Sequence, residues 1–492
     1  MADVVAGLRA ENSRLVAANI GLLAENAELR ALIGGLNSRV AQLEAKLGET
    51  SGNSSKPPST DPNSEREKQK QTRAERRRQA RKQGKQPGAV GRNLGQVPDP
   101  DRREVHRPEE CSGCGGGLAG GEVVGSQTRQ VFDLPPIRVE VTEHVAVRVR
   151  CACGCVTTGA FPAEATAPAC WGPGVRALGV YLTHRQHLPV LRTAELMSDI
   201  LGARVSTGFL SGLAGEAARR LTPFLARMKQ LLARNPVINT DETSIRVSAK
   251  SWWLHVIATP RLTLLAASHT RGREAIEAID VLPGYGGVIV HDGLTTYDNL
   301  DKAVHAQCGA HLVRHASRLH DHDDTRLFAR LMTETLLDAA AAAAKAAEQG
   351  RPAVPATTAR RLRARYRHAV DVGFRLLPPG TKPRLRNTGG WKPHQRDAWN
   401  LATRFRDDEA DILRFLTDTA IPFTNNNAER PLRPAKLHDK ISGCFRNPTN
   451  AASYATILSY VGTAAKHGRN LHETLVELFT IGPWLPPDAI PG

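Results

Sequence analysis

Leucine recurs at every seventh position near the start of the chain, and this repeat strongly restricts how these residues can fold. The repeat consists of Leu8, Leu15, Leu22, Leu29, Leu36 and Leu43. If these are the d positions, the a positions are Val5, Asn12, Asn19, Asn26, Ile33, Val40 and Leu47. Buried asparagines at a satisfy their amides against one another, which favours a paired, in-register coiled coil over an amphipathic helix lying on its own domain. Residues 1–48 are therefore predicted to make a homodimer or higher multimer.

The chain is long enough for several domains and is strongly basic. It has 492 residues, with 66 Lys and Arg against 49 Asp and Glu, a formal net charge of +17 at pH 7. Such an excess suits a polyanionic partner, although basic charge alone also fits a membrane surface or a ribosome. The sequence contains no apolar run of about 18 residues, and its first residues do not have the pattern of a secretory leader. We expect a cytoplasmic protein associated with the nucleoid through DNA, with no membrane partner.

Residues 49–101 have a composition that cannot bury a core. A Ser/Pro segment, "SGNSSKPPSTDPNS", is followed by "EREKQKQTRAERRRQARKQGKQPG", which is densely basic and has no aromatic residue. We expect a disordered linker whose basic side chains contact DNA phosphates without reading sequence. The candidate contacts are Arg76, Arg77, Arg78, Arg81 and Lys82.

Cysteines cluster in residues 102–168, where they predict a zinc-ribbon-like module. A "CSGC" knuckle is followed by alternating β character in "RQVFDLPP" and "VEVTEHVAVRVR", and then by "CACGC". Two thiolate pairs hold Zn²⁺ tetrahedrally and substitute for a small core, whereas a metal-free hairpin is the simpler alternative. The expected ligands are Cys111, Cys114, Cys151 and Cys153, with Cys155 as an alternative to Cys153.

Residues 169–235 have helical periodicity. The segment "LPVLRTAELMSDILGARVSTGFLSGLAGEAARRL" predicts one helix, a tight turn at "LGARVS" and a second helix that begins at Ser206. This is a helix-turn-helix-like arrangement, in which the second helix can enter a major groove. Two packed helices joined by a glycine turn are equally consistent with a purely structural role.

The pattern changes to α/β over residues 236–320. Three β-rich runs, "PVINTDETSIRV", "SWWLHVIAT" and "LTLLAAS", precede a helix-prone "REAIEAIDVL" and the strand-like "GGVIVHDG". The order of three strands, a helix and a fourth strand is that of a ribonuclease-H-like catalytic core. In that fold Asp241 lies on the first strand and Asp292 just past the end of the fourth, and these two strands are neighbours.

Helical patterning then fills residues 321–422, which we interpret as an all-helical insertion into the catalytic core. Residues 423–480 are expected to form its final helices, and 481–492 a tail. Asn425, Asn426 and Asn427 are expected to cap the first of these helices, with Glu429 in its first turn. Pro431 and Pro434 disturb a regular helix, because proline has no amide donor.

Clustered carboxylates repel each other unless cations neutralise them. Mg²⁺ prefers oxygen ligands and leaves coordination sites free for phosphate and water. Two such ions, about 3.5–4 Å apart, stabilise both the attacking and the leaving oxygen of a phosphoryl transfer. Alone, Asp292 before Gly293 is more typical of a turn, so the interpretation depends on three acids at the ends of elements.

Several motifs occur in an order that resembles the transposases of the insertion-sequence sixty-six family, of the Asp-Asp-Glu type. They include the leucine repeat, "SSKPPS", the cysteine-rich ribbon, "GPGVRALGVYL", "TDET", "WWLHVIAT", "HDGLTTY", "CGAHLVRH", "NNNAERPLRP" and "TAAKHGRN". The resemblance covers nearly the whole chain. It implies a triad of Asp241, Asp292 and Glu429 that holds two Mg²⁺ or Mn²⁺ ions. It further implies binding of terminal inverted repeats and target DNA, with or without accessory proteins of the same element.

The resemblance also singles out candidate DNA contacts. Cys308 and His311 form a Cys-x2-His motif of the kind that follows the fifth strand in related transposases, where the histidine contacts the site or the DNA. The motif alone does not justify a metal there. The candidate DNA contacts in this part of the chain are His311, Arg430, Arg433 and Lys436. Glu242 is left out of the triad, because strand alternation turns it away from Asp241.

The sequence thus predicts a DNA transposase that performs metal-dependent cleavage and strand transfer. The alternative is a zinc-ribbon DNA-binding protein whose ribonuclease-H-like domain is inactive. A serine or tyrosine recombinase would need a nucleophile with supporting groups, and the sequence has no convincing set of this kind. A coiled-coil adaptor explains only about the first 50 residues.

Overall fold

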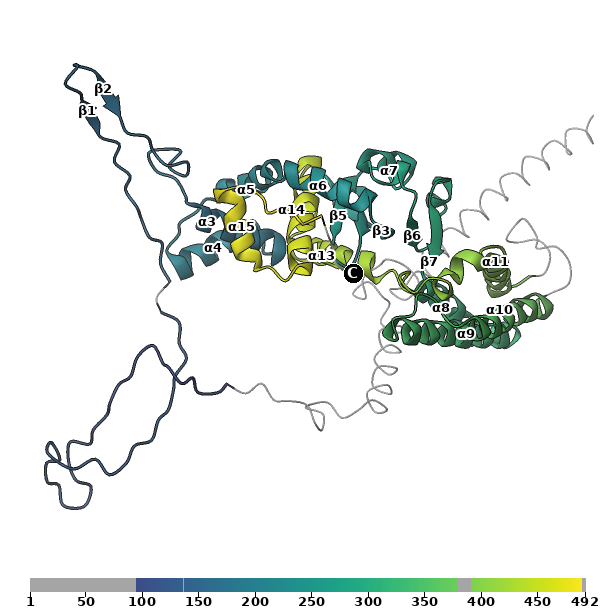
Figure 1. The fold of residues 1–492 in the computed structure, drawn as a ribbon, viewed down its shortest axis with the longest axis horizontal. Coiled ribbons are helices and arrows are strands. Elements are labelled where there is room, and N and C mark those ends of the chain that lie inside the picture. Colours follow the sequence, from purple (N-terminus) through teal and green to yellow (C-terminus); the bar gives the residue numbers. More distant parts are fainter. Residues whose placement is uncertain (1–93, 136, 378–390, 489–492) are drawn as a thin grey trace, which may run out of the picture. The chain divides into compact units, whose positions relative to one another are not determined.

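The computed structural model describes residues 94–135, 137–377 and 391–488 (Figure 1). The predicted coiled coil of residues 1–48 lies outside this part of the chain. So do the basic linker residues Arg76, Arg77, Arg78, Arg81 and Lys82. The chain divides into two units, Met1–Asp133 and Leu134–Gly492, which are described separately.

The first unit contains the "CSGC" knuckle, a tight turn closed by main-chain hydrogen bonds. The amide of Cys111 donates to the carbonyl of Gly116 at 2.9 Å, and the amide of Gly115 donates to the carbonyl of Cys111 at 2.8 Å. Gly115 has a φ of 73°, a conformation that glycine adopts without the steric cost of a side chain. The turn therefore depends on glycine as well as on cysteine.

The second unit opens with a hairpin around the other cysteine knuckle. Strand β1 (Arg148–Arg150) pairs antiparallel with β2 (Val156–Thr158), and "CACGC" forms the turn between them. The sequence had predicted longer strands ahead of this knuckle, in "RQVFDLPP" and "VEVTEHVAVRVR". In the described part of these segments only Arg148–Arg150 is strand, so that prediction is wrong. Val141 and Val145 of this segment remain exposed, because no other described part of the chain covers them.

A helical module follows, and it has the predicted helix, turn and helix. Helix α4 (Val190–Leu201) ends at Gly202, whose φ is 67°. Helix α5 (Thr207–Arg220) begins after Ser206, whose hydroxyl accepts the amide of Phe209 at 3.1 Å. This is the usual N-cap bond. The other helices of the module are α3 (Pro173–Val180), the π-helix Tyr181–Arg185 and α6 (Thr222–Ala233).

A five-stranded mixed sheet occupies the middle of this unit (Figure 1). Its strands are β3 (Val237–Val247), β4 (Lys250–Ala258), β5 (Thr263–Ser268), β6 (Val288–His291) and β7 (Val304–Gln307). The spatial order is β5-β4-β3-β6-β7, in which β3, β4 and β5 are antiparallel and β6 and β7 run parallel to β3. Helix α7 (Arg273–Ile279) connects β5 to β6. The predicted order of three strands, a helix and a strand is confirmed.

The free edge of the sheet at β5 is covered by a helix near the end of the chain, α14 (Pro448–Lys466). Ser459 and Thr463 are one helical turn apart, and their hydroxyls accept the amides of Leu265 at 2.8 Å and Thr263 at 3.1 Å. Lys466, one turn further, donates to two carbonyls of the β4–β5 turn, and burial lowers the pKa of its ammonium to about 7. Covering an edge strand in this way prevents it from pairing with another chain.

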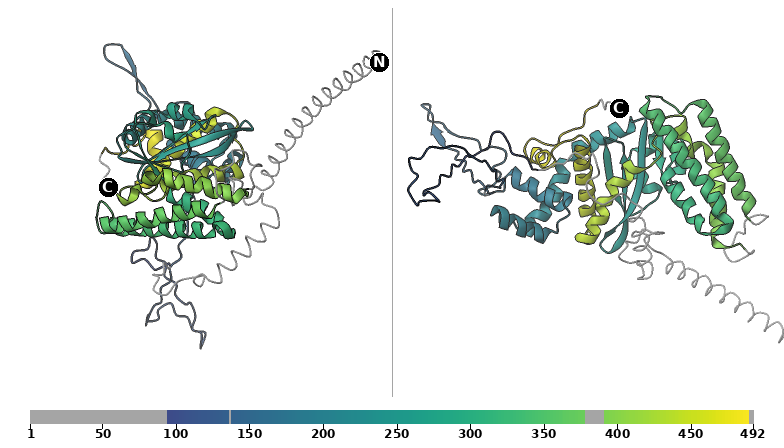
Figure 2. Two further views of the ribbon diagram at one scale, coloured as in Figure 1. Left: turned by 90° about the vertical axis from the view of Figure 1, so that its right-hand side faces the viewer. Right: turned by 90° about the horizontal axis from the view of Figure 1, so that it is seen from below.

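The segment between β7 and the final helices is helical, as its pattern predicts. It contains α8 (Gly309–Ser317), α9 (Asp323–Glu348), α10 (Ala356–Leu376), α11 (Pro393–Asp407) and α12 (Glu409–Ile412). In Figure 2 the green helices of this segment stack beside the sheet. Their apolar side chains, such as Phe328, Tyr366 and Phe405, form a core of their own that also includes Val290 and Ala306 of β6 and β7.

The last helices return to the sheet. They are α13 (Asn426–Ile441), α14 and α15 (Leu471–Thr480). Helix α13 contains Pro431 and Pro434 without an interruption of the helix between them, so the expected disturbance is not seen. Within the described residues, no helix is long and apolar enough to cross a lipid bilayer.

Replacing Thr463 tests how much the edge bonds contribute to stability. Thr463→Val keeps the shape of the side chain but leaves the buried amide of Thr263 without its acceptor. We expect the free energy of unfolding to fall by about 1–3 kcal/mol, measured by urea denaturation. Thr480→Val is the matched control, since Thr480 is exposed at the end of α15 and should change stability by less than about 0.5 kcal/mol. Equal losses in the two variants would contradict this role.

Candidate active site

Asp241 and Asp292 come from neighbouring parallel strands. Asp241 lies within β3, and Asp292 directly follows the last residue of β6. The register pairs Asn239 with Val290, so two residues further along, Asp241 and Asp292 are level with each other. Adjacent strands are about 4.8 Å apart, and residues at equivalent positions point to the same face. The sheet therefore brings these two carboxylates together.

Glu429 reaches this face through three asparagines, which we call the asparagine cluster: Asn239 of β3, Asn425 and Asn427. The amide nitrogen of the Asn239 side chain donates to Asn425 Oδ1 at 3.0 Å, and that of Asn427 donates to Asn239 Oδ1 at 3.1 Å. Asn425 Nδ2 also donates to the carbonyl of Thr240 at 2.8 Å. These bonds join the start of α13 to β3, and Glu429 lies in the first turn of α13.

The asparagines do not cap α13, so that expectation is wrong. Asn425 occupies the N-cap position but makes no side-chain bond to the first amides of the helix. Its side chain is fully buried against β3, and Asn426 is exposed. The bonds to the strand replace the capping bonds, because the amide group of a buried asparagine must find its partners where the packing places it.

The electrostatics of Asp241 also indicate that the acids are near one another. Burial and the charge of Asp292 raise the pKa of the Asp241 carboxyl to about 8, with smaller contributions from Glu242 and Glu429. The three carboxylates are not in mutual contact: in the described residues, Asp241, Asp292 and Glu429 do not form a group whose oxygens all lie within 4.8 Å of one another. The three carboxylates thus influence one another through their charges, but their oxygens are not all within 4.8 Å of one another.

Asp292 is held in place by its own turn and by an arginine from α11. Its Oδ1 accepts the amide of Leu294 at 3.1 Å, and its carbonyl accepts a bond from Arg404 Nη2 at 2.9 Å. Gly293 has a φ of 86°, and a Cβ there would lie 1.5 Å from Arg404 Nη2. The "HDG" motif therefore requires its glycine both for the backbone turn and for the approach of Arg404.

A hollow of about 410 Å³ adjoins Asp292. Its lining includes His291, His305, Asp298, Arg404, Asp408 and Asp411. Nδ1 of His305 and Nε2 of His291 are 3.2 Å apart, and burial together with the charge of His305 lowers the pKa of His291 to about 4. The walls of the hollow are polar and of both charges, and its lining reaches Asp292 only through the neighbouring residues His291 and Gly293.

Glu242 lies on the opposite face of β3, as strand alternation predicts. Its side chain accepts a hydrogen bond from the hydroxyl of Tyr297 at 2.9 Å and forms an ion pair with Arg271 at 2.7 Å. Thr240, on the same face, donates to the same tyrosine oxygen. Burial and the Glu242 charge raise the pKa of Tyr297. Glu242 therefore binds Tyr297 and Arg271 on the face of β3 opposite to Asp241.

His311 is the candidate DNA contact nearest to the acids. Cys308 precedes α8 and His311 lies in its first turn. His311 Nδ1 is 3.7 Å from Glu429 Oε1, and Cys308 Sγ accepts the amide of Asn425 at 3.2 Å. Cys308, His311 and Glu429 form the one group of three or more candidate metal ligands within 4.8 Å that the described residues contain.

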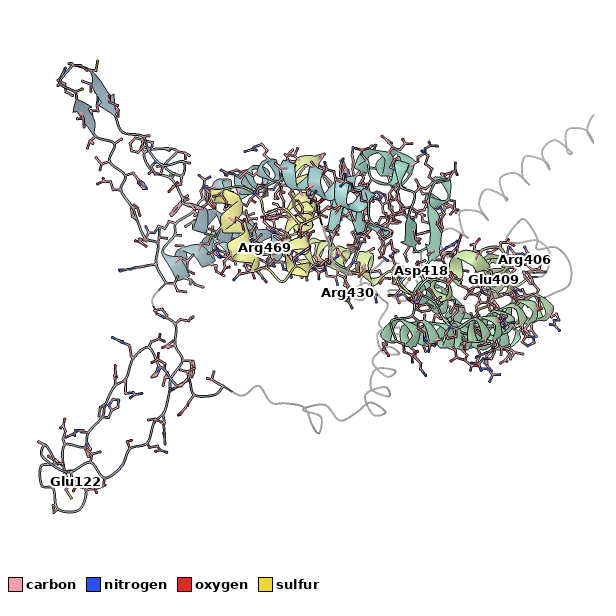
Figure 3. All side chains as sticks on the ribbon, viewed as in Figure 1. Glu122, Arg406, Glu409, Asp418, Arg430 and Arg469 are labelled. Carbon is pink, nitrogen blue, oxygen red and sulfur yellow. The ribbon has the colours of Figure 1, made fainter. Side chains whose placement is uncertain are left out.

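The basic candidates on α13 differ in their surroundings. Lys436 is half-buried, and its ammonium donates to the carbonyl and hydroxyl of Ser244 at 2.9 and 3.1 Å. Arg430 and Arg433 are exposed and have no ion pair or hydrogen bond to any described residue. Figure 3, in the same view as Figure 1, shows Arg430 below α13. In this structure Lys436 holds α13 against β3, whereas the two arginines are free to meet a polyanion.

Each cysteine knuckle has features that suit metal binding. Main-chain amides of Gly113 and Cys114 donate toward Cys111 and lower the pKa of its thiol. The amide and thiol of Cys155, and then the thiol of Cys151, do the same for Cys153. Amides that point at sulfur stabilise the thiolate, which is the form that binds zinc.

Comparison with known families decides the assignment of the chain. Residues 168–453, more than half of the chain, match the family described as Transposase IS66 family. The chain belongs to the IS66 family of transposases. Residues 108–154 match the zinc-finger binding domain of transposase IS66, which supports zinc binding by the knuckles of this IS66 transposase. Residues 5–94 match a family of unknown function. A search of curated proteins gives no match.

Two residues of this site were not anticipated from the sequence of the IS66-family chain. Asn239 precedes Asp241 by two positions and is buried, and asparagine is uncommon in strands, so its presence in β3 is a signal that could have revealed it. Arg404 has no such signal, because it is one of three arginines in α11. Only the packing of α11 against the end of β6 shows its contact with Asp292.

Gly309 fixes the spacing between α8 and the loop before α13. Its amide donates to the carbonyl of Phe423 at 2.8 Å, and a Cβ on Gly309 would lie 2.0 Å from the Phe423 ring. We expect Gly309→Ala to lower the free energy of unfolding by about 1–3 kcal/mol through overpacking. Gly212→Ala on α5 is the control, because a Cβ there meets nothing within 4 Å. This variant should have a free energy of unfolding about 0.5–1 kcal/mol higher than the parent, since alanine favours a helix over glycine. Thermal unfolding of both variants measures the difference, and a neutral Gly309→Ala would show that Phe423 adapts freely.

The raised pKa of Asp241 has a definite consequence for stability. The carboxyl titrates at 3.8 when unperturbed and at about 8 in the folded protein, so between pH 3.8 and about 8 folding is accompanied by uptake of a proton. Its cost grows up to about pH 8 and is constant above that pH. Without divalent ions, Asp241→Asn should therefore be more stable than the parent by at least about 1 kcal/mol at pH 8, the equivalent of one pKa unit.

This difference should shrink toward zero as the pH falls to 4, because both states of the parent then bind the proton. Unfolding in EDTA across this pH range provides the measurement. The exposed residue Asp301 supplies the control, Asp301→Asn, which should show no comparable gain. A destabilised Asp241→Asn at pH 8 would mean that the Asp241 charge is compensated in the fold.

Proposed function

We propose that this IS66-family protein cleaves the ends of its own DNA element and joins them to target DNA through Asp241, Asp292 and Glu429. The observation that carries the proposal is that Asp241 and Asp292 are level on neighbouring parallel strands. The asparagine cluster joins one of these strands to the helix that carries Glu429, and burial, the charge of Asp292 and, to a smaller extent, that of Glu429 raise the pKa of Asp241. Unneutralised acids of this kind are typical of a site built to hold cations.

The catalytic domain is proposed to be ribonuclease-H-like. The sheet order β5-β4-β3-β6-β7, with the first three strands antiparallel and the last two parallel to β3, supports this assignment. The helices between α8 and α13 would then be an insertion over residues 321–422 that interrupts the catalytic domain before its last helices. This arrangement explains why Asp292 and Glu429 are so far apart in the sequence.

The residues fit Mg²⁺ or Mn²⁺, because all three proposed ligands offer carboxylate oxygens. When bound, two such ions would activate water or a 3′-hydroxyl and stabilise the leaving oxygen of the phosphodiester. The protein itself supplies the alignment: the β3–β6 register places Asp241 beside Asp292, and Arg404 fixes the turn that carries Asp292. No covalent bond between protein and DNA is expected, since hydroxyl groups serve as the nucleophiles.

DNA binding is proposed to involve several parts of the chain. Arg430 and Arg433 are exposed near Glu429 and can meet the phosphates beside the cleaved bond. The zinc-finger segment, helix α5 and the basic residues of 49–101 would bind the terminal inverted repeats, while Lys436 would have to exchange its bonds with Ser244 for a phosphate. The proposed coiled coil of residues 1–48 would pair two subunits so that both ends of the element are held, with or without accessory proteins.

The zinc-finger segment is proposed to hold Zn²⁺ through Cys111, Cys114, Cys151 and Cys153. The matched segment ends at residue 154, so it includes these four cysteines and leaves out Cys155. Four thiolates suit a structural zinc site, which stabilises a segment with little apolar core. This role is separate from the chemistry at the carboxylates.

The direct test removes one carboxylate at a time. Asp241→Asn, Asp292→Asn and Glu429→Gln should each lower Mg²⁺-dependent cleavage of labelled element ends by at least about 100-fold, because the remaining acids hold the ions poorly. Binding of the same DNA, measured by mobility shift, should persist. Asp301→Asn removes an exposed acid outside the site and should cleave at the parental rate.

Three outcomes would overturn the proposal. Full strand transfer by any of the three variants would exclude that residue from catalysis. DNA binding without cleavage by the parent protein would favour a zinc-finger DNA-binding protein with an inactive catalytic domain. A protein–DNA adduct on a denaturing gel would instead indicate a recombinase with a protein nucleophile.

A further inference from the structure

Glu429 has two neighbours that the proposed magnesium chemistry does not use. Cys308 and His311 approach it from the start of α8, and one ligand atom from each of the three residues lies within 4.8 Å of the others. The group combines one sulfur, one imidazole nitrogen and one carboxylate oxygen. Such a mixed set is unsuited to Mg²⁺, which prefers oxygen, but suits Zn²⁺ and related transition metals.

The surroundings of these atoms favour ligation over simple packing. Cys308 is only 1 % exposed, and its sulfur already accepts the main-chain amide of Asn425 at 3.2 Å. Burial raises the pKa of the Cys308 thiol, and the main-chain amides of His311 and Asn425 directed at its sulfur only partly offset this effect, so a bound metal would have to displace the thiol proton. His311 Nδ1 is buried and has no hydrogen-bond partner, and it faces Glu429 Oε1 at 3.7 Å. A buried polar atom without a partner calls for an explanation such as an ion.

The backbone around the group is also firmly fixed. Gly309 and Phe423 are hydrogen-bonded and in close steric contact, and the buried side chain of Asn425 is bonded to β3. The start of α8 and the start of α13 therefore meet at a set distance. A metal site needs ligands held by rigid elements in this way.

We propose that Cys308, His311 and Glu429 form a site for Zn²⁺ or a similar transition metal. On binding, the Cys308 thiol loses its proton to solvent as the metal–sulfur bond forms, and the neutral imidazole and the carboxylate donate electron pairs to the metal. The thiolate and carboxylate together balance the charge of a divalent ion. Three protein ligands leave a fourth tetrahedral position for water or a DNA phosphate oxygen.

The site has a regulatory consequence that rests on the proposed function. Glu429 is both a ligand of this group and a member of the proposed triad, so the transition metal and the catalytic ions compete for the same carboxylate. Zn²⁺ should then inhibit cleavage that is supported by Mg²⁺. The binding of metal to the three residues is independent of whether the protein cleaves DNA.

Metal content of the full-length protein tests the site without reference to activity. The parent and Cys308→Ser are purified in Zn²⁺, dialysed and analysed for zinc per chain. Serine keeps an acceptor for the Asn425 amide but is a poor zinc ligand, so the variant should hold about one zinc ion fewer than the parent. Cys444→Ser is the matched control, since Cys444 is a free exposed thiol elsewhere and its loss should leave the zinc content unchanged.

A second variant keeps the test decisive if the buried substitution impairs folding. His311→Gln changes a side chain whose buried Nδ1 has no hydrogen-bond partner to lose, and it should also lower zinc content by about one ion per chain. Replacing Zn²⁺ with Co²⁺ adds a spectroscopic measurement, in which thiolate-to-cobalt absorption should be weaker in Cys308→Ser than in Cys444→Ser. Folding of each variant is checked by circular dichroism.

The outcomes separate this proposal from the proposed function. Equal zinc content and cobalt absorption in the parent and in folded His311→Gln would overturn the metal site, whatever the cleavage assays show. Loss of zinc in both variants supports the site even if the parent does not cut DNA. If the parent is active, its inhibition by Zn²⁺ should be at least about 10-fold stronger than that of Cys308→Ser, because the variant binds the ion weakly.

Discussion

The asparagine cluster is the interaction on which the arrangement of the acids depends. Its side chains, those of Asn239, Asn425 and Asn427, are joined by hydrogen bonds. Asn239 and Asn425 are 186 residues apart in the sequence. The amide side chain both donates and accepts, so a cluster of amides can be satisfied without introducing charge beside three carboxylates. A lysine or arginine there would neutralise the acids permanently and leave no reason for a cation to bind.

Glycines and hydroxyls serve a related purpose elsewhere, because they let elements approach closely. Gly293 admits Arg404, Gly309 admits Phe423, and Thr463 bonds to the edge strand β5. The first and third contacts bring α11 and α14 onto the sheet, and the second joins α8 to the loop before α13. The acids are therefore positioned by contacts made some distance from them, and changes at these contacts are expected to move the site without touching a carboxylate.

Much of the local structure follows from the sequence, but several contacts do not. The succession of strands and helices along the chain, the turn between α4 and α5 and the opposite orientations of Asp241 and Glu242 follow from periodicity and turn residues, whereas the adjacency of β3 and β6 was expected from the fold alone. The cap on α13 was predicted wrongly, since local pattern favours capping whereas tertiary packing turns Asn425 toward β3. The prediction of long strands before "CACGC" was wrong, because alternating valines form a sheet only where another layer of the fold covers their apolar face. The contact of Arg404 with Asp292 could not be predicted, since it depends on how α11 packs.

The long helical segment between α8 and α13 has a consequence for the order of events during synthesis. Asp241 and Asp292 can be in place when β3 to β7 have paired, but Glu429 joins them only after helices α8 to α12 have been made. Contacts between residues so distant in sequence raise the contact order and form late in folding. An incomplete chain leaving the ribosome would thus have two of the three acids, and a truncated product would lack Glu429.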